Sequence, residues 1–181
     1  MSMMLDKLHQ EHINITKLID VLEKQINSYQ ENGSINLQLI RDISDYIIHY
    51  PDLYHHPKED LVFELLRHKD KQIEPVINRL LNDHKILYES ATSLSRELNR
   101  LKDSSNAEIL VKQLKNYIAL SRSHMDVEEA ILFPRAKELL TENDWQQVET
   151  GFNYVEDPVF GKVIYKQYEN ILNSIIDDET G

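Results

Sequence analysis

Apolar side chains recur every three or four residues along most of the chain, the spacing that gives an α-helix one buried face. The first predicted helix covers about residues 3–30 and ends before Gly33. The second covers about residues 35–66 and has an irregular middle, because Pro51 and Pro57 lack the backbone N–H that a helix uses. The chain thus begins with two long amphipathic helices.

Two more amphipathic helices of similar length follow. One covers about residues 71–102, and the next starts at a capping-box pattern in residues 105–108 and runs to about Leu140. Four long helices joined by short loops are typical of an all-α, up-down-up-down four-helix bundle.

The last part of the chain has a different pattern. Thr141 is predicted to cap a short helix, Asp157–Gly161 is typical of a turn, and a final helix runs to about Ile176. About 40 residues are too few for an independent domain. We therefore expect one domain, a bundle over residues 1–140 with a C-terminal helical extension over residues 141–181 packed on it.

Composition and charge exclude several classes of function. The 181 residues carry a formal net charge of −11, which repels phosphate backbones and argues against nucleic-acid binding. The absence of Cys excludes disulfides, thiolate metal sites and cysteine nucleophiles. Neither a signal-peptide pattern nor a long apolar run is present, so the sequence predicts a cytoplasmic protein without a membrane partner.

Two histidines are followed by carboxylates at helical spacing. His55 precedes Glu59 and His124 precedes Glu128, and in both cases another acidic residue comes next. Residues four apart lie on one face of a helix, with Cβ atoms about 5–6 Å apart. An imidazole and a carboxylate placed in this way can bind one metal ion, or the carboxylate can reach a second ion beside it.

A single histidine on an apolar face precedes each of these pairs. His12 comes before His55 and His84 comes before His124, so the chain has the order H…HxxxE…H…HxxxE, one element per predicted helix. Carboxylates are almost never buried without a partner, and two metal cations would compensate for burying this set. Imidazole and carboxylate without thiolate suit iron, manganese or zinc.

This pattern resembles the hemerythrin-like, or HHE cation-binding, family. The resemblance covers residues 5 to about 140 and is most specific in 55–63 (HHPKEDLVF) and 124–134 (HMDVEEAILFP). It implies a four-helix bundle with two non-haem iron ions bridged by Glu59 and Glu128, each iron receiving one imidazole from a single-His helix and one from an HxxxE helix. The metal ligands that it implies are His12, His55, Glu59, His84, His124 and Glu128.

The sequence departs from the oxygen-carrying members of that family at one position. Where those proteins have a fifth histidine, four residues after His84, this chain has Tyr88, which could ligate, hydrogen-bond to a bound species or pack. Four histidines would leave open positions for dioxygen, peroxide or nitric oxide. We therefore expect a protein that senses or reacts with such a ligand or handles iron. The alternatives are a diiron oxidase or peroxidase, and an interaction module with a structural metal and an unidentified protein partner.

The register of the second helix leaves one local alternative. Pro57 fits in an early helical turn if the helix restarts near residue 52, and His55 then pairs with Glu59. If the register slips, His56 and Asp60 become the i,i+4 pair. Three other histidines are expected at the boundary or the surface: His9, His49 and His68. For His49, a hydrogen bond to one of the metal ligands is the alternative.

Overall fold

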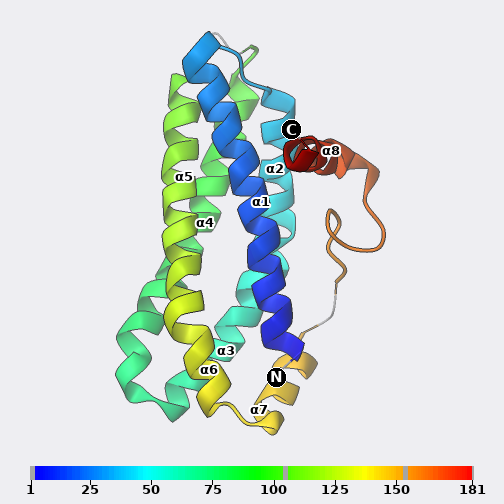
Figure 1. Cartoon of the computed structure of the whole chain (residues 1–181). Helices are drawn as coiled ribbons and strands as arrows, with labels where there is room; N and C mark the ends of the chain where they lie inside the picture. Colours follow the sequence, from blue (N-terminus) through cyan, green and yellow to red (C-terminus); the bar gives the residue numbers. More distant parts are fainter. Residues whose placement is uncertain (1–2, 104–105, 153–154, 181) are drawn as a thin grey trace.

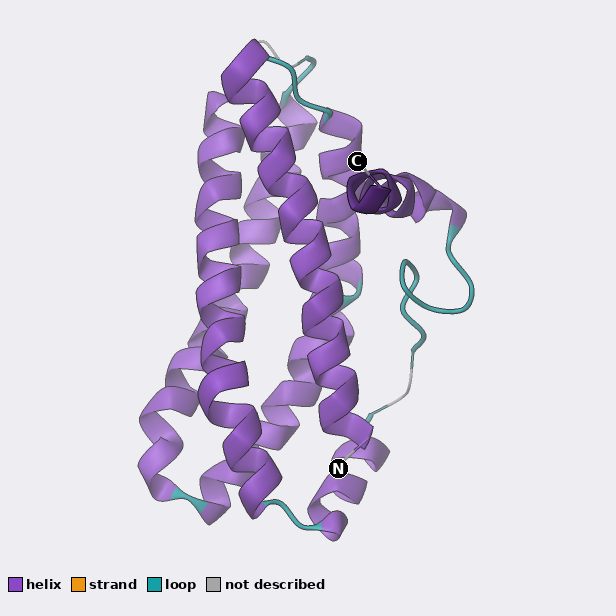
Figure 2. Cartoon of the chain, in the orientation of Figure 1, coloured by secondary structure: helices purple, strands orange, loops and turns teal. Residues whose placement is uncertain are grey.

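A computed structural model describes residues 3–103, 106–152 and 155–180 of the chain. This described part is almost entirely helical and contains no strand (Figure 2). None of the described helices has the length and apolar character that a membrane span requires. The predicted all-α class is confirmed.

The helices form four long antiparallel rods (Figure 1). The chain runs along the first rod, returns along the second and repeats this for the third and fourth. The α4 helix packs against α2 and α5, and α1 packs against α5. The predicted four-helix bundle is confirmed. The rods are α1 (Met3–Asn32); α2 (Leu37–His49), η1 (Pro51–His55) and α3 (His56–Lys69); η2 (Lys71–Ile73) and α4 (Glu74–Arg100); and α5 (Glu108–Val127), η4 (Glu128–Leu132) and α6 (Phe133–Leu139).

Side-chain caps explain where several helices begin. Asn36 Oδ1 accepts a hydrogen bond from the backbone N–H of Leu39 at the start of α2. Thr141 and Asp144 form a reciprocal capping box at the start of the short C-terminal helix, as predicted for Thr141. The capping box predicted for residues 105–108 includes Ser105, which lies outside the described residues.

The second and fourth rods each contain a π-helical turn, η1 and η4, directly before a proline-containing helix start. Pro57 and Pro134 lack an N–H, and each ring would clash with the carbonyl four residues earlier in a regular helix. Widening the preceding turn relieves this clash, and the backbone N–H of His56 and of Phe133 then donates five residues back. The irregularity that the prolines predicted is therefore a π turn rather than a break.

The C-terminal extension packs on the bundle at two places (Figure 1). The α7 helix (Glu142–Thr150) contacts α3 at one end of the bundle, whereas α8 (Glu169–Thr180), preceded by η5 (Lys166–Tyr168), crosses α1 and α2. The Tyr46 hydroxyl donates to Asp157 at 2.9 Å, and the Tyr168 hydroxyl donates to Asp45 at 2.7 Å. These bonds connect the extension to α2.

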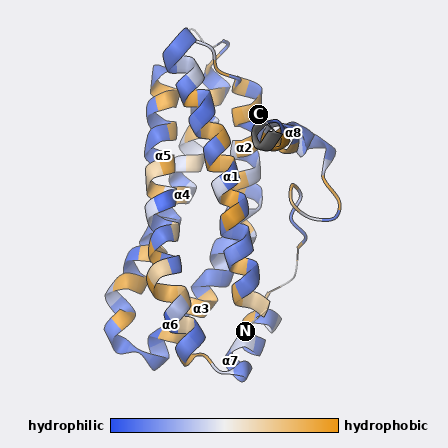
Figure 3. Ribbon diagram, viewed as in Figure 1, coloured by the Kyte–Doolittle hydropathy of each residue, from blue (hydrophilic) through white to orange (hydrophobic). Residues whose placement is uncertain are grey.

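The apolar interior is divided into two clusters along the bundle axis. Hydrophobic positions recur along every rod in Figure 3. Buried histidines lie between the two clusters. In α1, His12 stands between Leu8 of one cluster and Ile15 of the other, and His84 has the same position in α4. A polar layer thus separates two apolar ones.

We expect Tyr46→Phe to lower the free energy of unfolding by about 1–3 kcal/mol, because the half-buried Asp157 carboxylate loses the hydrogen bond that the buried Tyr46 hydroxyl donates. Urea titration followed by circular dichroism measures this. Tyr88→Phe, on an exposed side chain, is the matched control and should change the stability little. Equal stability of both variants would contradict the role of the Tyr46 bond.

Candidate metal centre

The polar layer contains the six residues that the sequence singled out, each contributed by one of the four rods. Glu59 and Glu128 have no exposed surface, and the four imidazoles are nearly as buried. His12, His55 and Glu59 form one compact group of potential metal donors. The full set in the layer is His12, His55, Glu59, His84, His124 and Glu128.

One pair of imidazoles lies on one side of the two carboxylates. Nε2 of His12 is 3.1 Å and Nε2 of His55 is 3.2 Å from the same atom, Oε1 of Glu59. The His12 nitrogen is also 3.3 Å from Oε2 of Glu128. Donors that bind one ion at about 2.1 Å and at right angles lie about 3.0 Å apart, so these contacts suit a shared cation.

The other pair lies on the opposite side. Nε2 of His84 is 3.4 Å from Oε2 of Glu59 and 3.6 Å from Oε1 of Glu128, and Nε2 of His124 is 3.1 Å from that same Glu128 oxygen. The two imidazole nitrogens are 3.1 Å apart. Each carboxylate therefore directs one oxygen to each imidazole pair, the arrangement of a carboxylate that bridges two cations.

Unsatisfied polar atoms test whether cations fit here. Oε2 of Glu59 and both oxygens of Glu128 are buried and accept no hydrogen bond within the described part of the chain, although imidazoles are close. Leaving a buried carboxylate oxygen without a partner costs about 1–3 kcal/mol or more. A cation between each imidazole pair and the carboxylates would satisfy all three oxygens, so the donor set fits two metal ions.

A ring of outer carboxylates orients the imidazoles. A carboxylate near Nδ1 holds the ring proton there and leaves the Nε2 lone pair for the layer, as is usual for histidine metal ligands. Three of the four contacts have hydrogen-bond distances, and the fourth is longer. The pairs are His12 with Glu129 (2.8 Å), His55 with Glu11 (2.7 Å), His84 with Asp60 (2.8 Å) and His124 with Asp83 (3.9 Å).

Comparison with protein-family models agrees with this geometry. The model of the hemerythrin HHE cation-binding domain matches residues 3–136. The chain belongs to this family. Comparison with curated proteins and with solved structures returned no match. Family membership and the His/Glu clusters together support a metal-binding protein.

This hemerythrin-family chain has one more histidine at the centre than the sequence analysis expected. His56 forms a group of potential donors with Glu59, His84 and His124, all within 4.8 Å of one another. The sequence leaves His55 and His56 as alternatives, but both lie in the layer. Nε2 of His55 is the one that contacts Glu59.

Asp60, the other half of the alternative pair, has an outer position. It accepts a hydrogen bond from Nδ1 of His84, which lies on a different helix, rather than pairing with His56. Of the outer carboxylates, Glu11 and Asp83 did not stand out in the sequence, and His56 stood out only as an alternative to His55. The adjacent acidic residue in each HxxxE motif was the one available signal, since Asp60 and Glu129 both reach Nδ1 atoms.

Tyr88 does not point toward the centre. Its side chain is 49% exposed on α4, so of the three roles left open for it the structure supports neither ligation nor contact with a bound species. His49 is exposed and contacts Asp45, so its alternative role near the metal is wrong. His68 lies at the surface, whereas His9 contacts Glu129 from outside.

Aromatic rings close two sides of the layer. Phe133 stacks on His12 with a centroid distance of 5.2 Å, and Phe63 stacks on His84 at 5.9 Å. Both phenylalanines are buried. They restrict the imidazole rings to one orientation and keep water from those faces.

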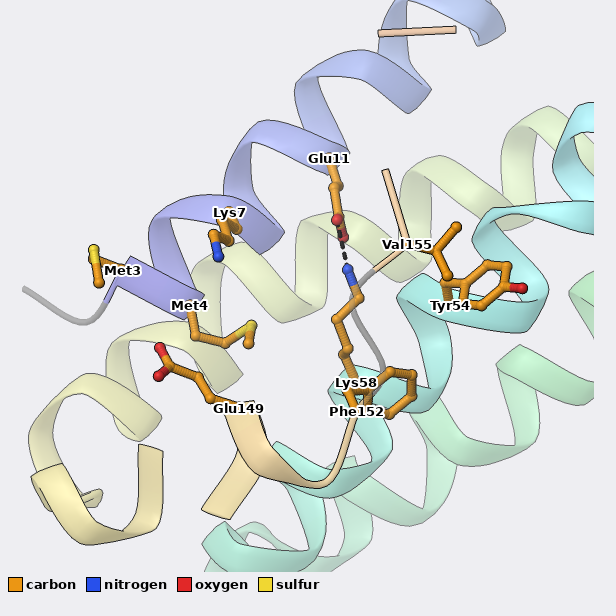
Figure 4. Close-up of a pocket in the computed structure, with 9 residues that line it drawn as sticks. All are labelled: Met3, Met4, Lys7, Glu11, Tyr54, Lys58, Glu149, Phe152 and Val155. Carbon is orange, nitrogen blue, oxygen red and sulfur yellow. Dashed lines mark hydrogen bonds and ion pairs between the residues drawn. The ribbon is translucent and has the colours of Figure 1, made fainter. Parts of the chain in front are cut away.

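A cavity of about 240 Å³ lies outside the layer, and Figure 4 shows the side chains that line it. Glu11 links the two, because one of its oxygens accepts from His55 Nδ1 and the other pairs with Lys58. A molecule in this cavity would meet Glu11 rather than the Nε2 side of the imidazoles. The lining consists of Met3, Met4, Lys7, Glu11, Tyr54, Lys58, Glu149, Phe152 and Val155.

The protonation of the layer follows from its charges. Burial would raise the pKa of Glu59 and of Glu128, but the surrounding imidazoles outweigh this effect and hold both values well below the usual range. Burial would lower the pKa of His12 and of His84, but their carboxylate neighbours raise both well above the usual range. Protons on these imidazoles therefore balance the two carboxylates, and a bound cation must displace them.

We expect cation binding to stabilise the protein more at high pH than at low pH. The pKa values of His12 and His84 are raised, so protonation of these two imidazoles stabilises the folded state. This stabilisation is complete below their ordinary pKa of 6.5 and is lost as the pH rises through the raised pKa values. A cation replaces these protons. At a hundredfold excess over Kd, one ion adds about 2.7 kcal/mol, or about 5–10 °C in Tm.

Melting curves with anaerobic iron(II) and with a chelator, at about pH 6 and about pH 8, measure this difference. The Tm gain should be larger at the higher pH. An equal gain at both values would contradict proton displacement, and no gain would contradict the cation site.

Glu128→Ala should abolish binding of at least one cation, because Glu128 faces both imidazole pairs. Elemental analysis after iron(II) loading measures the metal content. His68→Ala, at a surface position, should retain the wild-type content. Glu128→Gln, which keeps the shape of the side chain, should behave like Glu128→Ala. Equal metal content in all variants would show that a different face carries the donors.

Proposed function

We propose that this protein holds two iron ions between its imidazole pairs and presents them to a small ligand. The ligand is dioxygen, peroxide or nitric oxide, and the role is sensing, detoxification or iron handling. The observation that carries the proposal is the position of Glu59 and Glu128, each with one oxygen toward each imidazole pair. Family membership supports it, since the matched domain is named for cation binding.

Iron is preferred over the other metals that the donor set accepts. Imidazole and carboxylate ligands without thiolate suit iron, manganese and zinc. Iron bound by such donors changes oxidation state and binds dioxygen or nitric oxide, whereas zinc has no redox chemistry. Manganese and zinc remain alternative occupants in the isolated protein.

The residues of the chain hold and shield the centre. His12 and His55 would serve one ion and His84 and His124 the other, with both carboxylates shared. The outer carboxylates keep the Nδ1 protons in place, so that the Nε2 lone pairs stay available. The stacked phenylalanines exclude water from two sides.

An oxidase or peroxidase is the second candidate, and the cavity beside Glu11 is the observation that favours it. Its volume and mostly apolar lining suit a small organic molecule. None of the six predicted ligands is among its lining residues, however. A molecule bound there would be separated from the ions by Glu11 and His55, so a small ligand at the ions themselves is the better-supported proposal.

Adding nitric oxide or air to anaerobic iron(II)-loaded protein should produce new visible absorption within seconds to minutes. Zinc(II)-loaded protein is the redox-inert control and should remain colourless under both gases. A spectrum of the iron protein that neither gas changes would contradict ligand binding at the ions. Turnover of an added organic substrate under air would instead favour the oxidase.

A further inference from the structure

His56 lies outside the H…HxxxE…H…HxxxE order yet belongs to the polar layer. Its donor atom lies within 4.8 Å of those of Glu59, His84 and His124. We propose that His56 is a fifth nitrogen ligand of the centre and binds the same cation as His84 and His124. This assignment rests on the two-cation function proposed above.

The π turn explains how two consecutive histidines reach the layer. Neighbouring side chains in a regular α-helix point about 100° apart, so both rarely face one axis. Here His55 ends η1 and His56 begins α3, and their ring centroids are 5.5 Å apart with ring planes inclined by 55°. His55 faces His12, whereas His56 faces His84. The two neighbours therefore serve different sides of the carboxylates.

The ring of His56 lies beside the rings of one imidazole pair. It stacks on His84 with centroids 4.3 Å apart and planes inclined by 17°. It meets the ring of His124 nearly at a right angle, at 5.8 Å. Three imidazoles thus converge on one side of Glu59 and Glu128, and two on the other.

A buried carboxylate lies next to His56, as other carboxylates lie next to the other four imidazoles. Oδ1 of Asp52 lies 3.1 Å from Nδ1 of His56, and the Asp52 side chain is almost fully buried. Oδ1 accepts no hydrogen bond in this arrangement, and a small rotation of either side chain would let it accept from Nδ1 and leave Nε2 as the donor. Packing alone requires no buried carboxylate at this position, whereas a metal-binding imidazole commonly has one.

Cobalt(II) titration of the metal-free protein tests the assignment, because visible absorption reports the number and type of cobalt ligands. His56→Phe keeps a ring that can stack on His84 but removes the nitrogen. It should lower the affinity for one of the two cobalt(II) ions by at least about tenfold and change the absorption of that ion only. Asp52→Asn, which retains His56, should lower the affinity for the same ion by about 10–100-fold.

His68→Phe is the matched control, since it makes the same substitution at an exposed position of α3. Its titration should equal that of the wild type. His84→Phe should affect the same ion as His56→Phe, and the double variant should still bind the other ion with wild-type affinity. Loss of both ions from the double variant, with circular dichroism unchanged, would overturn the assignment to one cation.

The two proposals fail in different ways. Two cobalt(II) ions in wild type with unchanged binding and absorption in folded His56→Phe would overturn the role of His56 and leave the two-cation centre intact. If His56→Phe does not fold, unchanged cobalt binding by Asp52→Asn has the same meaning. A wild-type chain that binds no cobalt(II) and no iron(II) overturns the proposed function, and this assignment with it.

Discussion

Two carboxylates with no contact to solvent, Glu59 and Glu128, are the constraint around which this bundle is arranged. A buried charge without a partner is far costlier than the few kcal/mol that separate folded from unfolded protein. Five imidazoles surround these two carboxylates, and acidic side chains lie behind the imidazoles. A cation bound on either side of the two carboxylates would have carboxylate and imidazole ligands, and the outer acidic side chains would hold the imidazoles in place.

The position of this layer explains the shape of the hydrophobic core. Each rod contributes one polar interruption at the same level, so the apolar residues separate into one cluster above and one below. Four rods that share two cations would be tied together at mid-height. The C-terminal extension covers both clusters, α7 at one and α8 at the other, and so closes the bundle without entering the layer.

Periodicity was sufficient to predict the rods, because one buried face per helix leaves a clear apolar pattern over four long segments. The same reasoning predicted which residues meet within a helix, such as His55 with Glu59, since i,i+4 spacing fixes their distance. It failed where the helix geometry changes. A π turn before Pro57 brings His56 inward beside His55, and a rule based on 3.6 residues per turn allows one or the other.

The apolar periodicity of the sequence also could not predict contacts between side chains of different helices. Glu11 reaches His55 and Asp60 reaches His84 only because of how neighbouring rods are rotated about their axes, which single-helix periodicity does not specify. Tyr88 shows the same limit, because one turn beyond His84 its side chain is already on the exposed face of α4.

The most direct test of the two-cation centre is a crystal of iron-loaded protein measured with anomalous diffraction at the iron absorption edge. Two anomalous peaks should appear, one between Glu59, Glu128 and the His12/His55 pair and the other between the same carboxylates and the His84/His124 pair. A single peak, or peaks away from these two carboxylates, would contradict the account.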